Sequence, residues 1–290
     1  MSIKAVFVDM DGTLFDSDHH ISERTVKAIH ALKEKGVYFI VATGRPFPDV
    51  FGNLDKANLH PDFIITSNGS RVHDADHHIV FECDLDTDAV LKIFQLSPHL
   101  TEDGVVDATV PARKLYYNVN CKDRWFTNER LDVVRAAFHP SFEYEQVDPM
   151  TCTAESLQGT HSIWARGAHE DLQCVKNFID RECAGVVTCT FALPFILDIF
   201  PTGMHKGVAM AKVCERLGIT LSETVAFGDG MNDLQMLRAA GQGFVMANAA
   251  PMVKEAAAGL ALIDSNNDEG VVKKIEELMA AGAFASVSAS

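Results

Sequence analysis

Basic residues are scarce in this sequence. Its 290 residues include 25 lysines and arginines against 40 aspartates and glutamates, which gives a formal net charge of −15. Nucleic-acid backbones and anionic membrane surfaces both bind through Lys and Arg. We therefore expect neither nucleic acid nor a membrane as a partner. An anionic small molecule stays compatible with this charge, because a metal ion and a lysine can reverse its sign inside one cleft.

The sequence also lacks cysteine pairs and long apolar runs. Its seven cysteines are scattered, with no C-x-x-C pair, so neither a disulfide framework nor a structural zinc site is expected. No apolar run reaches the roughly 18 residues of a membrane helix, and no secretion signal precedes the first strand pattern. We predict a cytoplasmic protein that is a monomer or a weak homo-oligomer.

Strand and helix patterns alternate near the N-terminus. Ser22 and Gly36 are suitable start and stop residues for the first helix. A βαβ series of this kind favours a parallel sheet with helices on both faces. The predicted elements are strands 3–8, 37–41 and 63–66 and helices 22–35 and 47–57.

From about residue 84 the strand patterns become shorter and the loops more polar, which indicates an inserted domain with helices near 86–96, 129–138 and 169–181. The first pattern then resumes. We predict an α/β fold with a doubly wound parallel Rossmann-like core, formed by residues 1–83 and 196–290, and an inserted α+β cap of residues 84–195. The later core elements are strands 195–199, 224–227 and 243–246 and helices 206–217, 231–239 and 269–279.

Two aspartates, Asp9 and Asp11, stand at the end of the first apolar strand in the motif D-M-D-G-T-L. The strand period of two sends both the same way, so their charges lie about 6 to 7 Å apart and repel without a compensating cation. A single Asp at this place would more often cap the following helix. The pair after a buried strand favours a chemical role.

Two further segments supply groups that suit an anion. Thr43 and Gly44 end the second strand, where a hydroxyl and a backbone N–H can hold phosphate oxygens; alone, a Thr-Gly pair is more often an ordinary turn. Lys206 begins a helix, beside the favourable end of the helix dipole; alone, it would equally be a surface lysine. The adjacent His205 points about 100° away, so we leave it out of the chemistry.

Asp229 and Asp233 lie in the motif G-D-G-M-N-D after another apolar strand. One helical turn brings them together. The motif lacks the third glycine of a dinucleotide fingerprint and puts carboxylates where a pyrophosphate would bind. Four aspartates and a phosphate against one lysine require a cation, and oxygen ligands beside phosphate favour Mg²⁺.

These four motifs, in this order, resemble those of the haloacid dehalogenase superfamily, and T-S-N-G-S at 66–70 together with the large insert resembles its Cof-type sugar phosphatases. The resemblance implies that Asp9 is the nucleophile and that Asp11 protonates the leaving group and then activates water on the aspartyl-phosphate. It implies Mg²⁺ ligation by Asp9, the main-chain carbonyl of Asp11 and Asp229, supported by Asp233. The implied phosphate-binding residues are Met10, Thr43, Gly44, Lys206 and Asn232.

Substrate selection is less well marked. Arg45 and Asn68 are expected beside the core cleft, within reach of the substrate. Met204-His205 departs from the smaller or more polar pair expected before Lys206. Polar and aromatic residues of the cap are candidates for substrate contact, although such residues more often serve packing; they are Lys114, Tyr116, Tyr117, Asn118, Arg124, Trp125 and Trp164.

The expected activity is a Mg²⁺-dependent phosphatase that acts on small phosphorylated metabolites, with sugar phosphates favoured. A phosphomutase needs the same two aspartates and is the nearest alternative. A phosphonatase would require a Schiff-base lysine in the cap, and a dehalogenase lacks the second aspartate of the first motif. A non-catalytic phosphometabolite-binding protein on the same fold is the alternative from another class.

Overall fold

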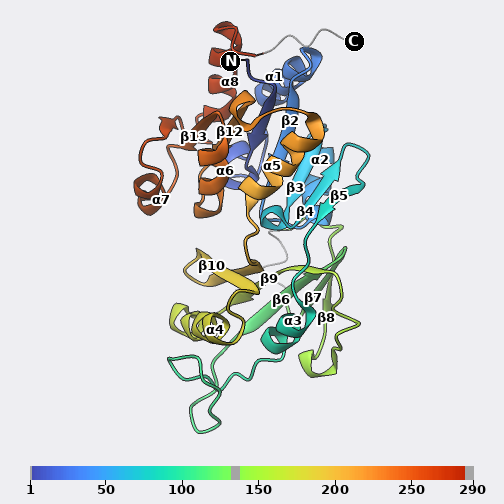
Figure 1. The fold of residues 1–290 in the computed structure, drawn as a ribbon, viewed down its shortest axis with the longest axis vertical. Coiled ribbons are helices and arrows are strands. Elements are labelled where there is room, and N and C mark those ends of the chain that lie inside the picture. Colours follow the sequence, from blue (N-terminus) through green and yellow to red (C-terminus); the bar gives the residue numbers. More distant parts are fainter. Residues whose placement is uncertain (1, 132–137, 285–290) are drawn as a thin grey trace. The chain divides into compact units, whose positions relative to one another are not determined.

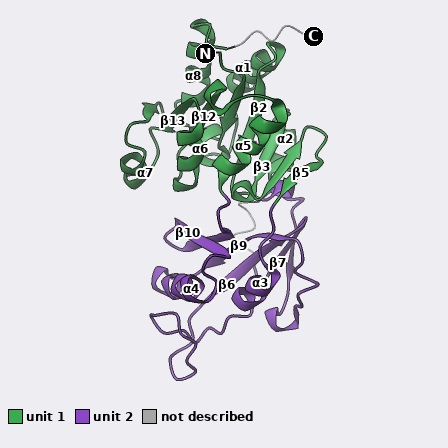
Figure 2. Cartoon of the chain, viewed as in Figure 1, with its two compact units in different colours: residues 1–45, 50–82, 205–290 green, residues 46–49, 83–204 purple. Residues whose placement is uncertain are grey.

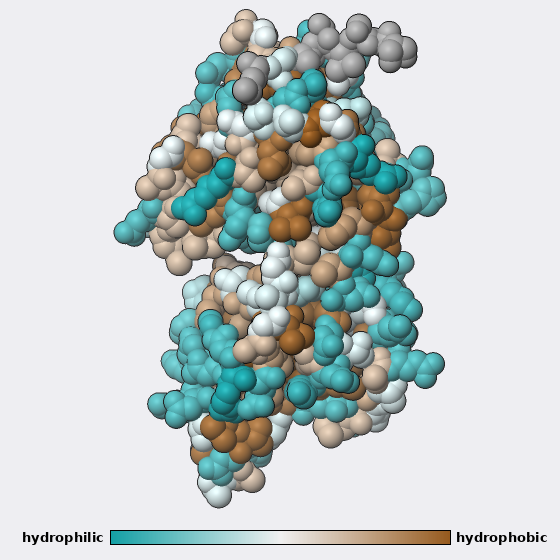
Figure 3. Space-filling view, in the orientation of Figure 1, coloured by the Kyte–Doolittle hydropathy of each residue, from teal (hydrophilic) through white to brown (hydrophobic). Residues whose placement is uncertain are grey.

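The computed structural model describes residues 2–131 and 138–284, which form two compact units. Unit 1 comprises residues 1–45, 50–82 and 205–290, and unit 2 comprises residues 46–49 and 83–204 (Figure 2). Hydrophilic and hydrophobic residues are interspersed on the visible face of each unit (Figure 3). Within the described residues, no helix has the length and apolar character needed to cross a membrane.

Unit 1 is built on an eight-stranded sheet in the order β14-β13-β12-β1-β2-β3-β4-β5 (Figure 1). Neighbours from β14 to β3 run parallel, whereas β3–β4 and β4–β5 are antiparallel. The strands are β1 (Ala5–Val8), β2 (Tyr38–Ala42), β3 (Phe63–Thr66), β4 (Arg71–Asp74), β5 (Ile79–Glu82), β12 (Thr224–Gly228), β13 (Gln242–Met246) and β14 (Ala261–Ile263).

Both faces of this sheet are covered by helices. As a result, successive residues of β1, which point to opposite faces, are all buried. Ala5 and Phe7 pack in one core cluster with residues of α5, α6 and α7, while α1 packs against β2 and α8. The helices of unit 1 are α1 (Glu23–Glu34), α2 (Phe47–Lys56, whose first residues belong to unit 2), α5 (Lys206–Leu217), α6 (Leu234–Ala239), α7 (Pro251–Ala256) and α8 (Gly270–Ala280).

Unit 2 holds a six-stranded sheet in the order β10-β11-β9-β6-β7-β8, antiparallel except for the pair β7–β8. One face of this sheet packs against the helices in a separate core cluster that includes Val119, Ile163 and Val175. The elements are β6 (Tyr116–Cys121), β7 (Arg124–Thr127), β8 (Tyr144–Gln146), β9 (Thr160–Arg166), β10 (Val187–Leu193), β11 (Ile196–Pro201), α3 (Thr87–Phe94) and α4 (His169–Glu182).

The predicted α/β class with a doubly wound parallel core is confirmed, but β11 corrects one boundary. This strand was predicted to belong to the core, whereas it pairs with β9 and β10 in the sheet of unit 2. Residues 194 and 195 form a tight turn between β10 and β11, and this local hairpin keeps the chain in unit 2 as far as residue 204. Most of the predicted helix 129–138 lies outside the described residues.

Candidate active site

The predicted motifs meet at one edge of the unit 1 sheet. Asp9 directly follows β1, Thr43 follows β2 and Asp229 follows β12, and these three strands are neighbours or near neighbours running in parallel. The carboxyl ends of parallel strands form the ligand-binding edge of such sheets. Residues more than 200 positions apart in the sequence therefore share one site.

Three aspartates form a compact acidic cluster. One carboxylate oxygen from each of Asp9, Asp229 and Asp233 lies within 4.8 Å of the others. Asp9 and Asp233 are buried, and Asp229 is half-buried. The approach of Asp229 requires a glycine at position 12, since a methyl group there would lie 2.4 Å from Asp229 Oδ2 and the backbone has φ +74°.

Lys206 is the cation of this cluster. Its side chain is fully buried, and its Nζ donates hydrogen bonds to Asp9 Oδ1 at 2.5 Å and to Asp233 Oδ1 at 2.6 Å. Burial alone would lower the pKa of the ammonium group, but the charges of Asp233 and Asp9 outweigh burial and raise this pKa. Lys206 therefore stays charged in the site.

One ammonium group does not balance three carboxylates. Burial, followed by the charge of Asp233, raises the pKa of Asp9 well above its usual range, although Lys206 acts in the opposite direction. The same two causes raise the pKa of Asp229 to about 6. The excess negative charge and the all-oxygen donor set fit a hard divalent cation.

Asp233 also organises the backbone around this cluster. Its Oδ2 accepts hydrogen bonds from the backbone N–H groups of Asp229 at 3.0 Å and Gly230 at 2.8 Å, while its Oδ1 faces Lys206. The four-residue spacing predicted the contact between the two aspartates. One buried carboxylate thus fixes the loop after β12 and holds the lysine.

Asp11 lies outside the acidic cluster, which corrects the expectation that it points the same way as Asp9. Its carboxylate pairs with the Arg45 guanidinium, with Nε 2.6 Å from Oδ2 and Nη2 2.7 Å from Oδ1. The Asp11 side chain is 40% exposed, and His19 Nδ1 lies 3.6 Å from its Oδ1. Strand alternation fails here because β1 ends at Val8 and residues 10–14 form a turn.

The predicted phosphate-binding residues lie close to these groups. Thr43 is buried, and its Oγ1 accepts a hydrogen bond from the Arg45 backbone N–H at 3.1 Å. A methyl group on Gly44 would lie 3.2 Å from Asn68 Oδ1, and Asn232 Nδ2 donates to the same oxygen at 2.9 Å. Met10 is buried in the turn after β1.

His205 serves the helix rather than the chemistry. It is the N-cap of α5, where its Nδ1 accepts a hydrogen bond from the Val208 backbone N–H at 3.3 Å. Burial lowers the pKa of its imidazole, and the neutral ring is the form that can accept this bond. The pair Met204-His205, which differs from the smaller or more polar pair expected there, therefore supplies the N-cap of the helix that Lys206 begins.

Two residues that orient the acidic cluster were missed in the sequence. Thr13 Oγ1 donates to Asp229 Oδ1 at 3.1 Å. Asn248 Nδ2 lies 2.8 Å from the Gly12 carbonyl oxygen and 3.4 Å from Asp229 Oδ2. A usable signal was present for Asn248, because it closely follows β13 at the same edge of the sheet.

Several candidates in unit 2 serve packing. Trp125 is fully buried, its Nε1 donates to Asn118 Oδ1 at 2.9 Å, and Trp164 packs against it with ring centroids 5.9 Å apart. Tyr117 belongs to the core cluster of unit 2, and Arg124 pairs with Glu145. Lys114 and Arg166 lie over the Tyr116 ring at 5.9 and 4.9 Å from its centroid.

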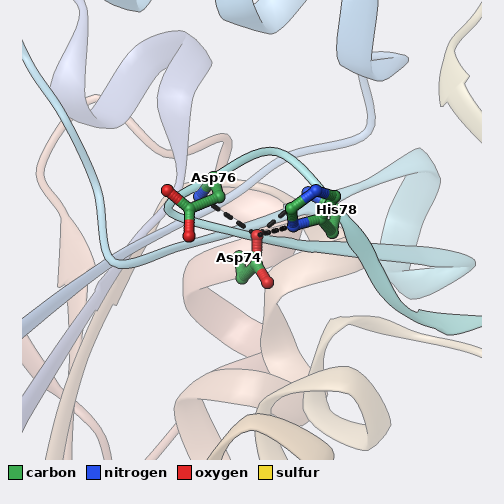
Figure 4. A group of neighbouring side chains, drawn as sticks. All are labelled: Asp74, Asp76 and His78. Carbon is green, nitrogen blue, oxygen red and sulfur yellow. Dashed lines mark hydrogen bonds and ion pairs between the residues drawn. The ribbon is translucent and has the colours of Figure 1, made fainter.

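A second group of possible metal ligands, Asp74, Asp76 and His78, lies on the hairpin between β4 and β5 (Figure 4). Asp74 Oδ1 accepts hydrogen bonds from the backbone N–H groups of Asp76 at 3.1 Å and His78 at 2.9 Å. These bonds close the turn, so the local geometry explains the grouping.

Comparison with known proteins gives the family. A model of the haloacid dehalogenase-like hydrolases matches residues 6–275. The chain belongs to this family. It is 31% identical over 268 residues to the HMP-PP phosphatase of Yersinia pseudotuberculosis, covering 91% of this chain and 90% of the relative. It is also 31% identical over 276 residues to a putative phosphatase of Haemophilus influenzae, covering 94% and 96% of the two chains.

Solved structures agree with this membership. A haloacid dehalogenase-like hydrolase from Bacteroides thetaiotaomicron superposes with a TM-score of 0.79 at 25% identity, covering 95% of this chain and 99% of the other. The subclass IIB sugar phosphatase BT4131 gives a TM-score of 0.74 at 22% identity, with 95% and 99% coverage. The predicted superfamily, its Cof-type phosphatase group and the hydrolase class are confirmed.

Proposed function

We propose that this hydrolase is a Mg²⁺-dependent phosphatase of small phosphorylated metabolites, sugar phosphates among them, and that it works through an aspartyl-phosphate on Asp9. The observation that supports this most is the compact cluster of Asp9, Asp229 and Asp233 around the buried Lys206. Lys206 engages Asp9 Oδ1, and Oδ2 has no hydrogen-bond partner among the described residues. Asp9 Oδ2 is therefore the oxygen proposed to attack phosphorus.

In the first proposed step, Asp9 Oδ2 forms a bond to phosphorus as the bond from phosphorus to the leaving oxygen breaks, and Asp11 gives that oxygen a proton. In the second step, Asp11 takes a proton from water as the water oxygen forms a bond to phosphorus and the bond from phosphorus to Asp9 Oδ2 breaks, which releases phosphate and returns the Asp9 carboxylate. The bound cation would lie among the three clustered aspartates and supply positive charge to the phosphoryl group. Lys206 adds a fixed positive charge there.

Asp11 must change partners to perform these steps. In the structure both its oxygens accept hydrogen bonds from Arg45, so the carboxyl group is engaged with this side chain. We propose that Arg45 turns to the substrate when it binds, which agrees with the predicted substrate contact of Arg45. Asp11 is then available to the leaving oxygen.

The decisive experiment measures phosphate release from a panel of sugar phosphates, other phosphate monoesters and HMP-PP, with and without Mg²⁺. We expect release that requires Mg²⁺ and that Asp9→Asn abolishes, while the exposed control Asp76→Asn keeps full activity. Absence of turnover on every phosphoester would overturn the proposed phosphatase activity. Conversion of a hexose 1-phosphate to its 6-phosphate without phosphate release would indicate the mutase instead.

A further inference from the structure

The turn after β3 has an unusual backbone for a buried segment. Ser67, Asn68 and Gly69 have φ values of 51°, 55° and 105°, so two non-glycine residues in succession adopt the left-handed region. All three are buried. The hydroxyls of Thr66, Ser67 and Ser70 have no hydrogen-bond partner among the described residues. Strained backbone and unsatisfied buried polar groups both cost stability, so the surrounding structure must hold this turn in place.

The turn contacts the phosphate-binding segments through its backbone and through Asn68. The N–H groups of Asn68 and Ser67 donate to the carbonyl oxygens of Thr43 at 3.1 Å and Arg45 at 3.0 Å. Asn68 Oδ1 accepts from Asn232 Nδ2 at 2.9 Å. This hydrogen bond fixes the direction of the Asn232 amide, which is one of the proposed phosphate ligands.

The same turn contacts the residue that precedes Lys206. A methyl group on Gly69 would lie 2.7 Å from the His205 carbonyl oxygen and 3.3 Å from Ala209 Cβ. The backbone of the turn therefore packs directly against the first turn of α5. A displacement of this contact would move the start of the helix and the ammonium group of Lys206 with it.

We propose that the turn Ser67–Gly69 is the positioning element of the phosphate site: it sets Asn232 and Lys206 relative to the segment Thr43–Arg45. Asn68 is a positioning residue that acts through Asn232, and Gly69 acts through His205. This inference rests on the proposed function, since it assigns the geometry of the phosphate site to a segment outside the groups that contact phosphate.

The first test is Asn68→Gly, with Asn58→Gly as its matched control. Asn58 has φ 53° and is exposed in unit 1, so both substitutions place glycine at nearly the same left-handed backbone. We expect similar melting temperatures for both variants. Only Asn68→Gly should lower kcat/KM, by roughly tenfold to a hundredfold, which is the usual effect of losing a residue that orients a ligand-binding group.

Binding of inorganic phosphate, measured by calorimetry in the presence of Mg²⁺, gives a readout that does not depend on turnover. We expect Asn68→Gly to weaken phosphate binding and Asn58→Gly to leave it unchanged. Unchanged kcat/KM and phosphate affinity in Asn68→Gly would overturn the positioning role. Phosphate binding by wild-type protein without turnover of any ester would instead count against the proposed function alone.

The second test compares Gly69→Ala with Gly259→Ala. Both glycines have positive φ, 105° and 95°, but a methyl group on Gly259 meets nothing within 4 Å. We expect both variants to lose some thermal stability, because alanine is strained at a backbone with positive φ. Only Gly69→Ala should lose phosphate affinity as well. Equal phosphate affinity in the two folded variants would contradict the contact with His205. If Gly69→Ala does not fold, the comparison of Asn68 with Asn58 decides.

Discussion

At the scale of single residues, Asp9 and Asp11 differ in surroundings although only one residue separates them. Asp9 is buried against Lys206, whereas Asp11 is part-exposed and paired with Arg45. Burial and a fixed ammonium suit a nucleophile that must be desolvated and oriented. Exposure and an exchangeable partner suit a group that must pass protons to and from water.

Asp11→Asn should therefore fail at a different step from Asp9→Asn. We expect kcat to fall by roughly 10² to 10⁴, the usual contribution of a general acid or base, with little change in stability because the ion pair with Arg45 is part-exposed. Steady-state kinetics measure the loss, and intact mass after acid quenching shows whether a phosphoryl group is retained on the protein. Asp9→Asn should retain none.

The exposed residue Asp18 supplies the control for this pair. Asp18→Asn changes the same type of side chain in the loop that follows the first motif and should keep wild-type kcat. Full turnover by Asp11→Asn would refute its role as the proton carrier, while the nucleophilic role of Asp9 would be unaffected.

The sequence predicted which residues gather but not how each side chain points. Motif order and the common edge of parallel strands were enough to bring Asp9, Asp229 and Lys206 into one site. The direction of Asp11 was not predictable from strand alternation, because the strand ends one residue before Asp9 and the turn that follows depends on Gly12 at φ +74°. Thr13 was missed because a single hydroxyl carries no pattern, whereas Asn248 could have been found from its place just after β13.

At the scale of elements, the start of α1 was predictable from local chemistry. Ser22 is its N-cap, as expected, with Oγ accepting from the Thr25 backbone N–H at 3.2 Å. The same hydroxyl donates to Glu269 Oε1 at 2.6 Å, just before α8. One serine thus caps one helix and ties it to another.

Ser22→Ala should destabilise unit 1 without affecting catalysis. The lost cap costs about 1 kcal/mol, which corresponds to a fall in melting temperature of roughly 2 to 4 °C. Calorimetry measures the fall, and Ser22→Thr, which keeps a hydroxyl, should recover most of it. An unchanged melting temperature in Ser22→Ala would show that water replaces the cap without loss.

Pairing between strands is where prediction from sequence failed at this scale. The residues of β11 alternate between buried and half-buried, with Leu197 and Ile199 in the core of unit 2. Alternation of apolar and polar residues indicates that one face of a strand is buried, but it does not indicate which sheet the strand joins. The antiparallel hairpin β4–β5 at the edge of the unit 1 sheet was not predicted either. Its two short strands follow each other without a helix between them, so they lack the strand-helix alternation that identified the other core strands.

At the scale of the whole molecule, core clusters that each lie within one unit explain how a long insertion is accommodated. The clusters of units 1 and 2 share no residue, so the strands that precede and follow the insert still pair in one sheet around β1. The site residues of unit 1 come from both halves of that sheet. Folding of this sheet therefore concentrates the negative charge at one edge, in a chain that already carries −15.

We expect this charge to make the stability of the protein depend on pH and, if Mg²⁺ binds as proposed, on Mg²⁺ as well. Without a cation, burial and Asp233 raise the pKa of Asp229 from 3.8 to about 6. Between these values the folded state binds more protons than the unfolded state, so the contribution of Asp229 to stability falls as the pH rises towards 6. The proposed Mg²⁺ would bind the ionised carboxylates, and at low pH it would first have to displace protons.

We therefore expect Mg²⁺ to raise the melting temperature clearly at about pH 7.5 and much less at about pH 5, because protons compete with the cation below the pKa of Asp229. Differential scanning calorimetry with Mg²⁺ or with a chelator measures both values. Asp229→Asn removes one of the proposed charged ligands and should reduce the Mg²⁺-dependent rise at about pH 7.5, whereas Asp76→Asn on the hairpin between β4 and β5 should preserve it. Equal stabilisation at the two pH values, or an undiminished rise in Asp229→Asn, would place the cation elsewhere than among these carboxylates.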